Sequence, residues 1–197
     1  MSAAVSSLPS ESKQTLRLQW RRRRREALPP VETLLQRRAL AQVPLLLGAQ
    51  GWLGISWPLA GEADLRCLAA VLPGRLALPA IVDDHLVYRR WSPTTALAKD
   101  ACGIPAPVED MALAAEAMAL LLVPALAIDQ HGIRLGSGGG WYDRLRAAPA
   151  WRAVPALAVL PAACVVEALP IDPWDVPFDG WLDERGCHWI RPAAVHR

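Results

Sequence analysis

The most apolar stretch of the sequence, residues 118–128, leads directly into a glycine-rich segment. It is too short to span a bilayer, which takes roughly 20 apolar residues, and it is interrupted by Pro124. We therefore interpret it as a buried strand with its approach. A strand without polar alternation is typical of a parallel sheet whose two faces are both covered, so this stretch favours an α/β fold.

Short apolar runs alternate with helical patterns along the rest of the chain. Helices are predicted over residues 12–27, 31–42, 62–70 and 141–148, and strands over residues 43–47, 52–57, 75–82, 86–91 and 154–160. This order predicts a single α/β domain of three-layer type, in which helices flank a largely parallel sheet and a basic helix comes first. No interdomain linker is visible, so we expect a flexible tail over residues 1–11 and one domain over 12–197.

The charge of the chain is unevenly distributed. Residues 13–38 contain nine Lys or Arg and two Asp or Glu, although the net charge of the whole chain is only +2. A basic element of this kind indicates an anionic partner, which could be a nucleotide phosphate, a nucleic acid or an acidic membrane. No signal peptide is visible and the four cysteines form no C-x-x-C pair, so we expect reduced thiols, a cytoplasmic location and no membrane partner.

The glycine-rich segment carries the clearest chemical signal. Four of its five residues from Gly136 to Gly140 are glycines, which let backbone N–H groups approach an anion. Taken alone, such a run more often means a flexible turn, and it matches neither standard phosphate-binding motif. The residues on either side of the run strengthen the case for phosphate binding. Arg134 can pair with phosphate charge, and Asp143 can hold Mg²⁺ against a triphosphate. Asp143 could equally be a first-turn residue that interacts with the helix end.

The predicted first helix has a basic face and an apolar stripe. Leu16 and Trp20 form the stripe, and four basic residues share the neighbouring face by their spacing: Lys13, Arg17, Arg21 and Arg24. This face could point at phosphates. Most of the arginine run over residues 21–25 fits a solvated surface, and a nucleic-acid site would lack interleaved aromatic residues beyond Trp20.

The segment 13–17, Lys-Gln-Thr-Leu-Arg, and the segment 134–143, Arg-Leu-Gly-Ser-Gly-Gly-Gly-Trp-Tyr-Asp, together resemble the 5-formyltetrahydrofolate cyclo-ligases. The likeness covers about residues 12–184. It implies a monomeric enzyme that uses ATP and Mg²⁺ to close 5-formyltetrahydrofolate into 5,10-methenyltetrahydrofolate, releasing ADP and phosphate. The implied intermediate is a formyl group phosphorylated on its oxygen.

The resemblance also implies roles for single residues, with Arg134 in the catalytic one. The implied ATP contacts are Lys13, Arg17, Arg134, Leu135, Gly136, Ser137, Gly138, Gly139, Gly140, Trp141 and Tyr142. The implied Mg²⁺ ligands are Asp143 and Asp175, and the implied folate contacts are Trp57, Glu62, Gly139, Gly140 and Trp141. Without the resemblance, Glu62 would fit a helix-capping carboxylate and Trp57 a core aromatic residue.

The chain departs from the family pattern at several positions. Family members often carry Lys or Arg where this chain has Ser137 and Gly139, usually have Tyr where it has Trp141, and often have an imidazole or amide where it has Trp174. The missing loop charge should weaken phosphate binding unless the arginine-rich helix compensates. Two alternatives therefore stay open: an inactive or repurposed relative that binds nucleotide or folate, and, ranked below it, an RNA-associated protein that works through residues 21–25.

Overall fold

The computed structural model describes residues 13–48, 50–108 and 111–190, and the predicted tail over 1–11 lies outside them. An eight-stranded sheet forms the centre of the molecule, in the order β13-β12-β10-β7-β1-β2-β3-β6. Its strands are β1 (Trp52–Gly54), β2 (Leu76–Val82), β3 (His85–Trp91), β6 (Ala112–Leu113), β7 (Met118–Pro124), β10 (Ala156–Val159), β12 (Gly180–Asp183) and β13 (Gly186–Trp189).

The five strands in the middle of this sheet run parallel, and the strands at its two edges run antiparallel. The parallel pairs are β12 with β10, β10 with β7, β7 with β1, and β1 with β2. β13 pairs antiparallel with β12, and β3 continues the other edge antiparallel to β2 and β6. The predicted α/β fold with a largely parallel sheet is therefore confirmed.

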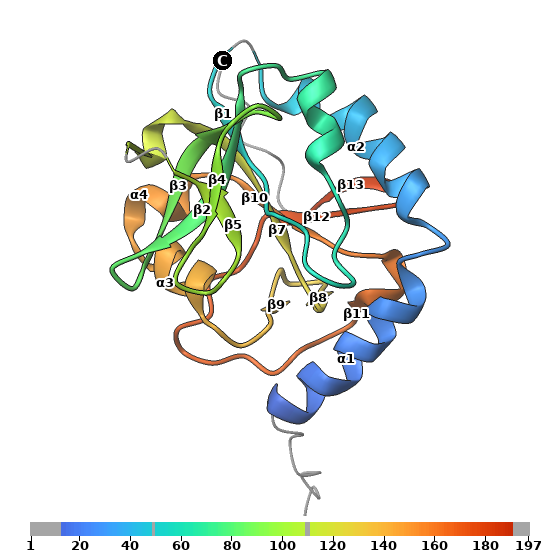
Figure 1. Ribbon diagram of the computed structural model, residues 1–197. Coiled ribbons are helices and arrows are strands. Elements are labelled where there is room, and N and C mark those ends of the chain that lie inside the picture. The colour runs from blue at the N-terminus through green and yellow to red at the C-terminus, as the bar shows by residue number, and fades with distance from the viewer. Residues whose placement is uncertain (1–12, 49, 109–110, 191–197) are drawn as a thin grey trace, which may run out of the picture.

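Helices cover both faces of the sheet (Figure 1), with α2 (Glu32–Leu46) on one face and α3 (Trp141–Ala147) and α4 (Pro149–Ala153) on the other. The central strand β7 shows why both faces are apolar. Leu120 and Leu122 belong to the core that contains the inward residues of α2, whereas Leu121 and Val123 belong to the core beneath α3 and α4. Successive side chains of a strand point to opposite faces, so an unbroken apolar run builds two cores.

The apolar stretch 118–128 forms two strands in two different sheets, not the single strand that we predicted. β7 ends at Pro124, and β8 (Ala127–Asp129) belongs to a small sheet with β9 (Arg134–Leu135) and β11 (Val165–Val166). Proline cannot donate to a strand ladder, which explains why the stretch leaves the large sheet at this point. The bend brings the glycine-rich segment back toward the end of the central strand.

Two other sequence predictions were wrong. Residues 43–47 are not a strand, because α2 continues to Leu46 with Pro44 inside it. The fully buried residues Leu35, Ala39 and Val43 recur at helical spacing, so packing against the sheet overrides the local preference of the last turn. Of the helix predicted over 62–70, only a 3₁₀ segment, Arg66–Ala70, forms.

Helix α1 (Lys13–Ala27) lies across the small sheet, and its predicted start at residue 12 falls outside the described residues. Leu16 and Trp20 pack on the buried residues of β8 and β9, as the apolar stripe predicted. Arg24 is buried and extends this inward stripe, so it does not share the outer basic face that we assigned to it. In the described part of the chain, no helix is long and apolar enough to cross a bilayer.

Candidate active site

A cavity of about 750 Å³ opens beyond the carboxyl ends of the parallel strands. Its lining includes Ser56 and Trp57 after β1, Ile81 on β2, and Pro124 at the end of β7. Ligands of open α/β sheets bind at this edge. Every residue that the sequence singled out for ATP, metal or folate lines the same cavity: Lys13, Arg17, Trp57, Glu62, Arg134, Leu135, Gly136, Ser137, Gly138, Gly139, Gly140, Trp141, Tyr142, Asp143 and Asp175.

The glycine loop joins β9 to the first turn of α3. Gly138 and Gly140 have φ values of 111° and 66°, a region that side chains with a Cβ rarely adopt. The loop is held from outside by arginines: Arg17 Nε donates to the Gly136 carbonyl at 3.3 Å, and Arg144 Nη1 donates to the Gly139 carbonyl at 3.0 Å. The loop therefore has no basic residue of its own, but arginine side chains from α1 and α3 lie against it.

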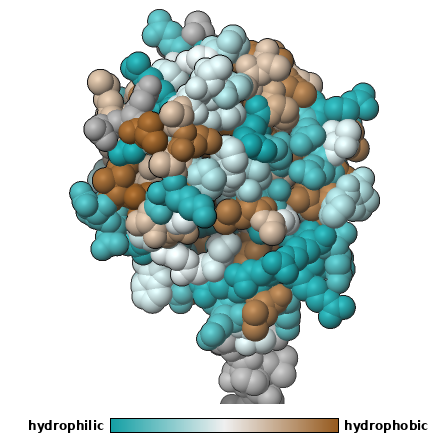
Figure 2. Space-filling model, viewed as in Figure 1, coloured by the Kyte–Doolittle hydropathy of each residue, from teal (hydrophilic) through white to brown (hydrophobic). Residues whose placement is uncertain are grey.

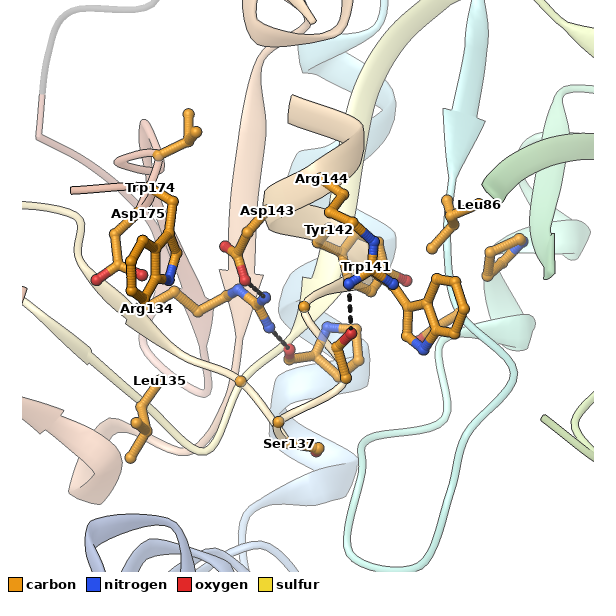
Figure 3. A pocket seen from close by; sticks show the side chains of 18 of the residues that line it. Leu86, Arg134, Leu135, Ser137, Trp141, Tyr142, Asp143, Arg144, Trp174 and Asp175 are labelled. Atoms are coloured by element: carbon orange, nitrogen blue, oxygen red, sulfur yellow. Dashed lines mark hydrogen bonds and ion pairs between the residues drawn. The ribbon is translucent and has the colours of Figure 1, made fainter. Parts of the chain in front are cut away.

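Arg134 lies at the centre of the site, with only 6% of its side chain exposed. Its Nη1 donates to the Pro124 carbonyl at 3.1 Å, and its Nη2 lies 3.7 Å from Asp143 Oδ2 (Figure 3). The guanidinium also stacks over the rings of Tyr142 and Phe178. Within the described residues, its buried Nε donor has no hydrogen-bond partner. Arg134 is nevertheless part of the cavity lining.

Two carboxylates of the site are each paired with a cation. Asp143 faces Arg134, while Asp175 Oδ2 accepts a hydrogen bond of 2.5 Å from Lys13 Nζ. The same ammonium lies 2.7 Å from Asp172, a residue that the sequence analysis missed. Burial lowers the pKa of Lys13, but the hydrogen bonds and charges of the two aspartates outweigh it and raise that pKa above 10.5. Lys13 is therefore a fixed cation.

The oxygen ligands suit a hard cation that is held partly by its substrate. In the described ranges 13–48, 50–108 and 111–190, no group of three or more His, Cys, Asp or Glu could hold a metal ion. Mg²⁺ does not need such a group, because it commonly binds one or two carboxylates together with substrate phosphates. Asp143 and Asp175, the two expected metal ligands, line one cavity.

Glu62 and Trp57 line the cavity from the segment that follows β1. Glu62 Oε2 accepts a hydrogen bond from the Leu59 N–H at 3.2 Å, and Glu62 Oε1 lies 3.5 Å from Arg24 Nη2. Arg66 covers one face of the Trp57 ring, with its guanidinium carbon 4.3 Å from the ring centre. Both side chains are thus fixed by neighbours that are themselves charged.

An apolar wall completes the site, and Trp141 is the member of it that the sequence analysis named. Leu86 of β3 and Trp141 of α3 stand on the side away from Arg134 and Asp175 (Figure 3), and Pro79, Ile81 and Ile104 also line the cavity. Arg144 lies over the Trp141 ring, with its guanidinium carbon 4.4 Å from the ring centre. Burial raises the pKa of Tyr142 to about 12, so its hydroxyl stays protonated at neutral pH. The cavity therefore has a charged side and a flat apolar side.

Comparison with known proteins places this arrangement in one family. The family model described as the 5-formyltetrahydrofolate cyclo-ligase family matches residues 9–183. A 5-formyltetrahydrofolate cyclo-ligase of Escherichia coli is 31% identical over 96 residues, covering 47% of this chain and 52% of that protein. One of Haemophilus influenzae is 35% identical over 97 residues, covering 47% and 51%. The match thus spans about half the length of these relatives.

Two solved structures share the fold over nearly the whole chain. The NMR structure of Aquifex aeolicus 5,10-methenyltetrahydrofolate synthetase superposes with a TM-score of 0.73 at 27% identity, covering 94% of this chain and 99% of that one. A 5,10-methenyltetrahydrofolate synthetase of Mycoplasma pneumoniae superposes with a TM-score of 0.65 at 18% identity, covering 88% and 99%. At that identity, the second likeness supports the fold alone.

Proposed function

Because this chain belongs to the 5-formyltetrahydrofolate cyclo-ligase family, we propose that it closes 5-formyltetrahydrofolate into 5,10-methenyltetrahydrofolate with ATP, releasing ADP and phosphate. The observation that supports this most is that the expected nucleotide residues and the expected folate residues line one cavity. A reaction between two substrates needs their reacting atoms side by side, and one shared cavity provides this.

The nucleotide occupies the side of the cavity formed by α1 and the glycine loop. Lys13 and Arg17 reach this side from α1, and Arg144 reaches it from α3. These cations compensate for the missing Lys or Arg at Ser137 and Gly139. Together with the N–H groups of the loop, they can neutralise phosphate charge.

Asp143 and Asp175 would hold Mg²⁺, which would draw charge from the phosphoryl group that is transferred. Lys13 and Arg134, the partners of these carboxylates, are the cations that would contact phosphate oxygens. The four side chains therefore pair with one another in the free protein, and they would bind Mg²⁺ and phosphate when the nucleotide is present.

The folate lies between the apolar wall and Glu62. Trp57 and Trp141 offer flat surfaces to its rings, and the Glu62 carboxylate can accept hydrogen bonds from ring N–H groups. This orientation points the formyl group toward Arg134, between the two sides of the cavity. The protein's task is mostly placement, and no nucleophilic side chain is required.

The reaction proceeds in two displacements. The formyl oxygen attacks the γ-phosphorus of ATP and ADP leaves, which turns a poor leaving group into a phosphate ester. N10 of the folate then attacks the formyl carbon, the phosphate departs with the former formyl oxygen, and N10 loses its proton. Arg134, which lines the cavity, meets the charge that develops on the phosphoryl oxygens.

The test is the absorbance of the methenyl product, recorded with purified protein, 5-formyltetrahydrofolate and Mg²⁺, with and without ATP. We expect a rise that requires ATP and falls by about a hundredfold or more in Asp143→Ala. Glu167→Ala removes an exposed carboxylate outside the cavity and should leave the rate unchanged. Folded protein that binds nucleotide but forms no product would instead identify a repurposed relative.

The RNA-associated alternative is not favoured by the structure. Figure 2 shows hydrophilic side chains gathered over α1 in the lower part of the view, which is the surface that such a role would use. However, Arg24 is buried, and Arg17 contacts the glycine loop. The arginine-rich helix thus contributes to the cavity. A cytoplasmic monomer that binds no membrane and no nucleic acid completes the proposal.

A further inference from the structure

Arg24 is a buried arginine on the inward stripe of α1, four and eight residues after Trp20 and Leu16. Its side chain is only 5% exposed. Burying a guanidinium is unfavourable unless charge and hydrogen bonds compensate for the lost water. An arginine at this position therefore needs an explanation beyond packing, because a leucine would continue the stripe.

Two groups on other elements compensate for the charge of Arg24. Its Nη1 donates to the Ala125 carbonyl at 3.1 Å, and its Nη2 lies 3.5 Å from Glu62 Oε1. The Glu62 side chain is also only 5% exposed, so the pair interacts in surroundings with little solvent screening. The second Glu62 oxygen accepts from the Leu59 N–H. Both Glu62 oxygens thus have a partner, which fixes the carboxylate in the cavity.

The Ala125 carbonyl links this pair to the other side of the site. It directly follows the Pro124 carbonyl, which accepts from Arg134 Nη1 at 3.1 Å. Two adjacent carbonyls at the end of the central strand therefore anchor Arg134 and Arg24. The position of Glu62 relative to Arg134 is set through this one strand end.

We propose that Arg24 is a positioning residue, which fixes the Glu62 carboxylate, as an acceptor for the folate ring, at a defined place relative to Arg134. This inference rests on the proposed function. Arg24 does not line the cavity and touches no substrate; it acts through Glu62. Loss of Arg24 should therefore weaken folate binding far more than ATP binding.

The test compares Arg24→Met with Arg23→Met, which removes the exposed arginine next to it. For Arg24→Met, we expect the KM for 5-formyltetrahydrofolate to rise by about tenfold or more and the KM for ATP to change less than about twofold. Lysine in Arg24→Lys keeps the positive charge, but its single ammonium group cannot reach both the Ala125 carbonyl and Glu62. This variant should therefore restore part of the folate affinity. Arg23→Met should match the unmodified protein.

A double-substitution cycle shows whether Arg24 acts through Glu62. If it does, adding Arg24→Lys to Glu62→Gln should raise the folate KM no further. Additive effects, or equal changes in both KM values together with a lowered Tm, would overturn the proposal and leave Arg24 a general packing residue. If Arg24→Met does not fold, Arg24→Lys decides by the same criteria. Absence of product from the unmodified protein would contradict the proposed function instead.

Discussion

The Lys13 ammonium lies 2.5 Å from the Asp175 carboxylate, although the two residues are 162 positions apart in the chain. The contact joins the first described helix turn to the loop before β12. It pairs an expected phosphate ligand with an expected metal ligand. The charge of each side chain is thus balanced by the other.

Lys13→Met should lower the free energy of unfolding at neutral pH, and this difference should disappear in alkali. Burial, the largest single effect, lowers the pKa of Lys13, but Asp172 and Asp175 together raise it above 10.5. Because the folded pKa exceeds the unfolded one, the stabilisation is fully present below the unfolded pKa and is lost as the pH rises through the folded pKa.

This can be checked by thermal unfolding of both proteins from about pH 8 to about pH 11.5, a window that spans the ordinary pKa of lysine. The Tm gap should narrow above pH 10.5. Lys99→Met, which removes an exposed lysine, serves as the control and should show no such gap. If the Tm difference between Lys13→Met and the unmodified protein stays constant across this pH range, the pairing of Lys13 with Asp172 and Asp175 is contradicted.

Asp172 and Asp175 both contact Lys13, but we expect only Asp175 to serve the metal. Asp175→Asn should raise the Mg²⁺ concentration needed for half-maximal activity by about tenfold or more. Asp172→Asn should change it little, because Asp172 was not matched to the family's metal position and is the more exposed of the two. A titration of activity with Mg²⁺ measures both. Equal shifts in the two variants would argue against the assignment.

Gly140 should be required for nucleotide binding beyond its effect on stability. Gly140 and Gly74 have nearly the same positive φ, 66° and 70°, but only Gly140 belongs to the cavity. Replacement by Ala should cost each variant about 1–2 kcal/mol of unfolding free energy. Only Gly140→Ala should also raise the KM for ATP. A rise in both variants would mean that the effect comes from lost stability.

Cys102 should be the first thiol to react with a maleimide near neutral pH, and bound folate should slow it. It is exposed and lines the cavity, whereas burial raises the pKa of both Cys164 and Cys187 to about 11. Reaction requires the thiolate, so those two react slowly. Mass spectrometry of the labelled protein, with Cys102→Ser as control, measures the rate. Labelling that folate leaves unchanged would place the ligand elsewhere.

Much of the fold could be predicted because the apolar runs are long enough to identify buried strands. The errors occurred where tertiary packing decides the outcome. The apolar run 43–47 suggested a strand, but the helical spacing of Leu35, Ala39 and Val43 against the sheet keeps residues 43–46 helical. Pro124 divides one apolar run between two sheets, which no local pattern specifies.

The candidate site could be predicted where residues adjacent in sequence act together, as in the glycine loop. It could not be predicted where the partners come from distant segments. Nothing near Asp172 indicates a contact with Lys13, and the arginine run conceals that Arg24 points inward. The apolar wall depends on how the β2–β3 hairpin faces α3, so Leu86 carried no signal either.

The central claim is that the formyl oxygen leaves as part of phosphate, and its isotopic fate tests this most directly. 5-Formyltetrahydrofolate labelled with ¹⁸O in the formyl group would be converted with ATP and Mg²⁺, and the released phosphate analysed by mass spectrometry. We predict one ¹⁸O atom in each phosphate molecule formed with product. Unlabelled phosphate, or ring closure without ADP and phosphate, would contradict the account.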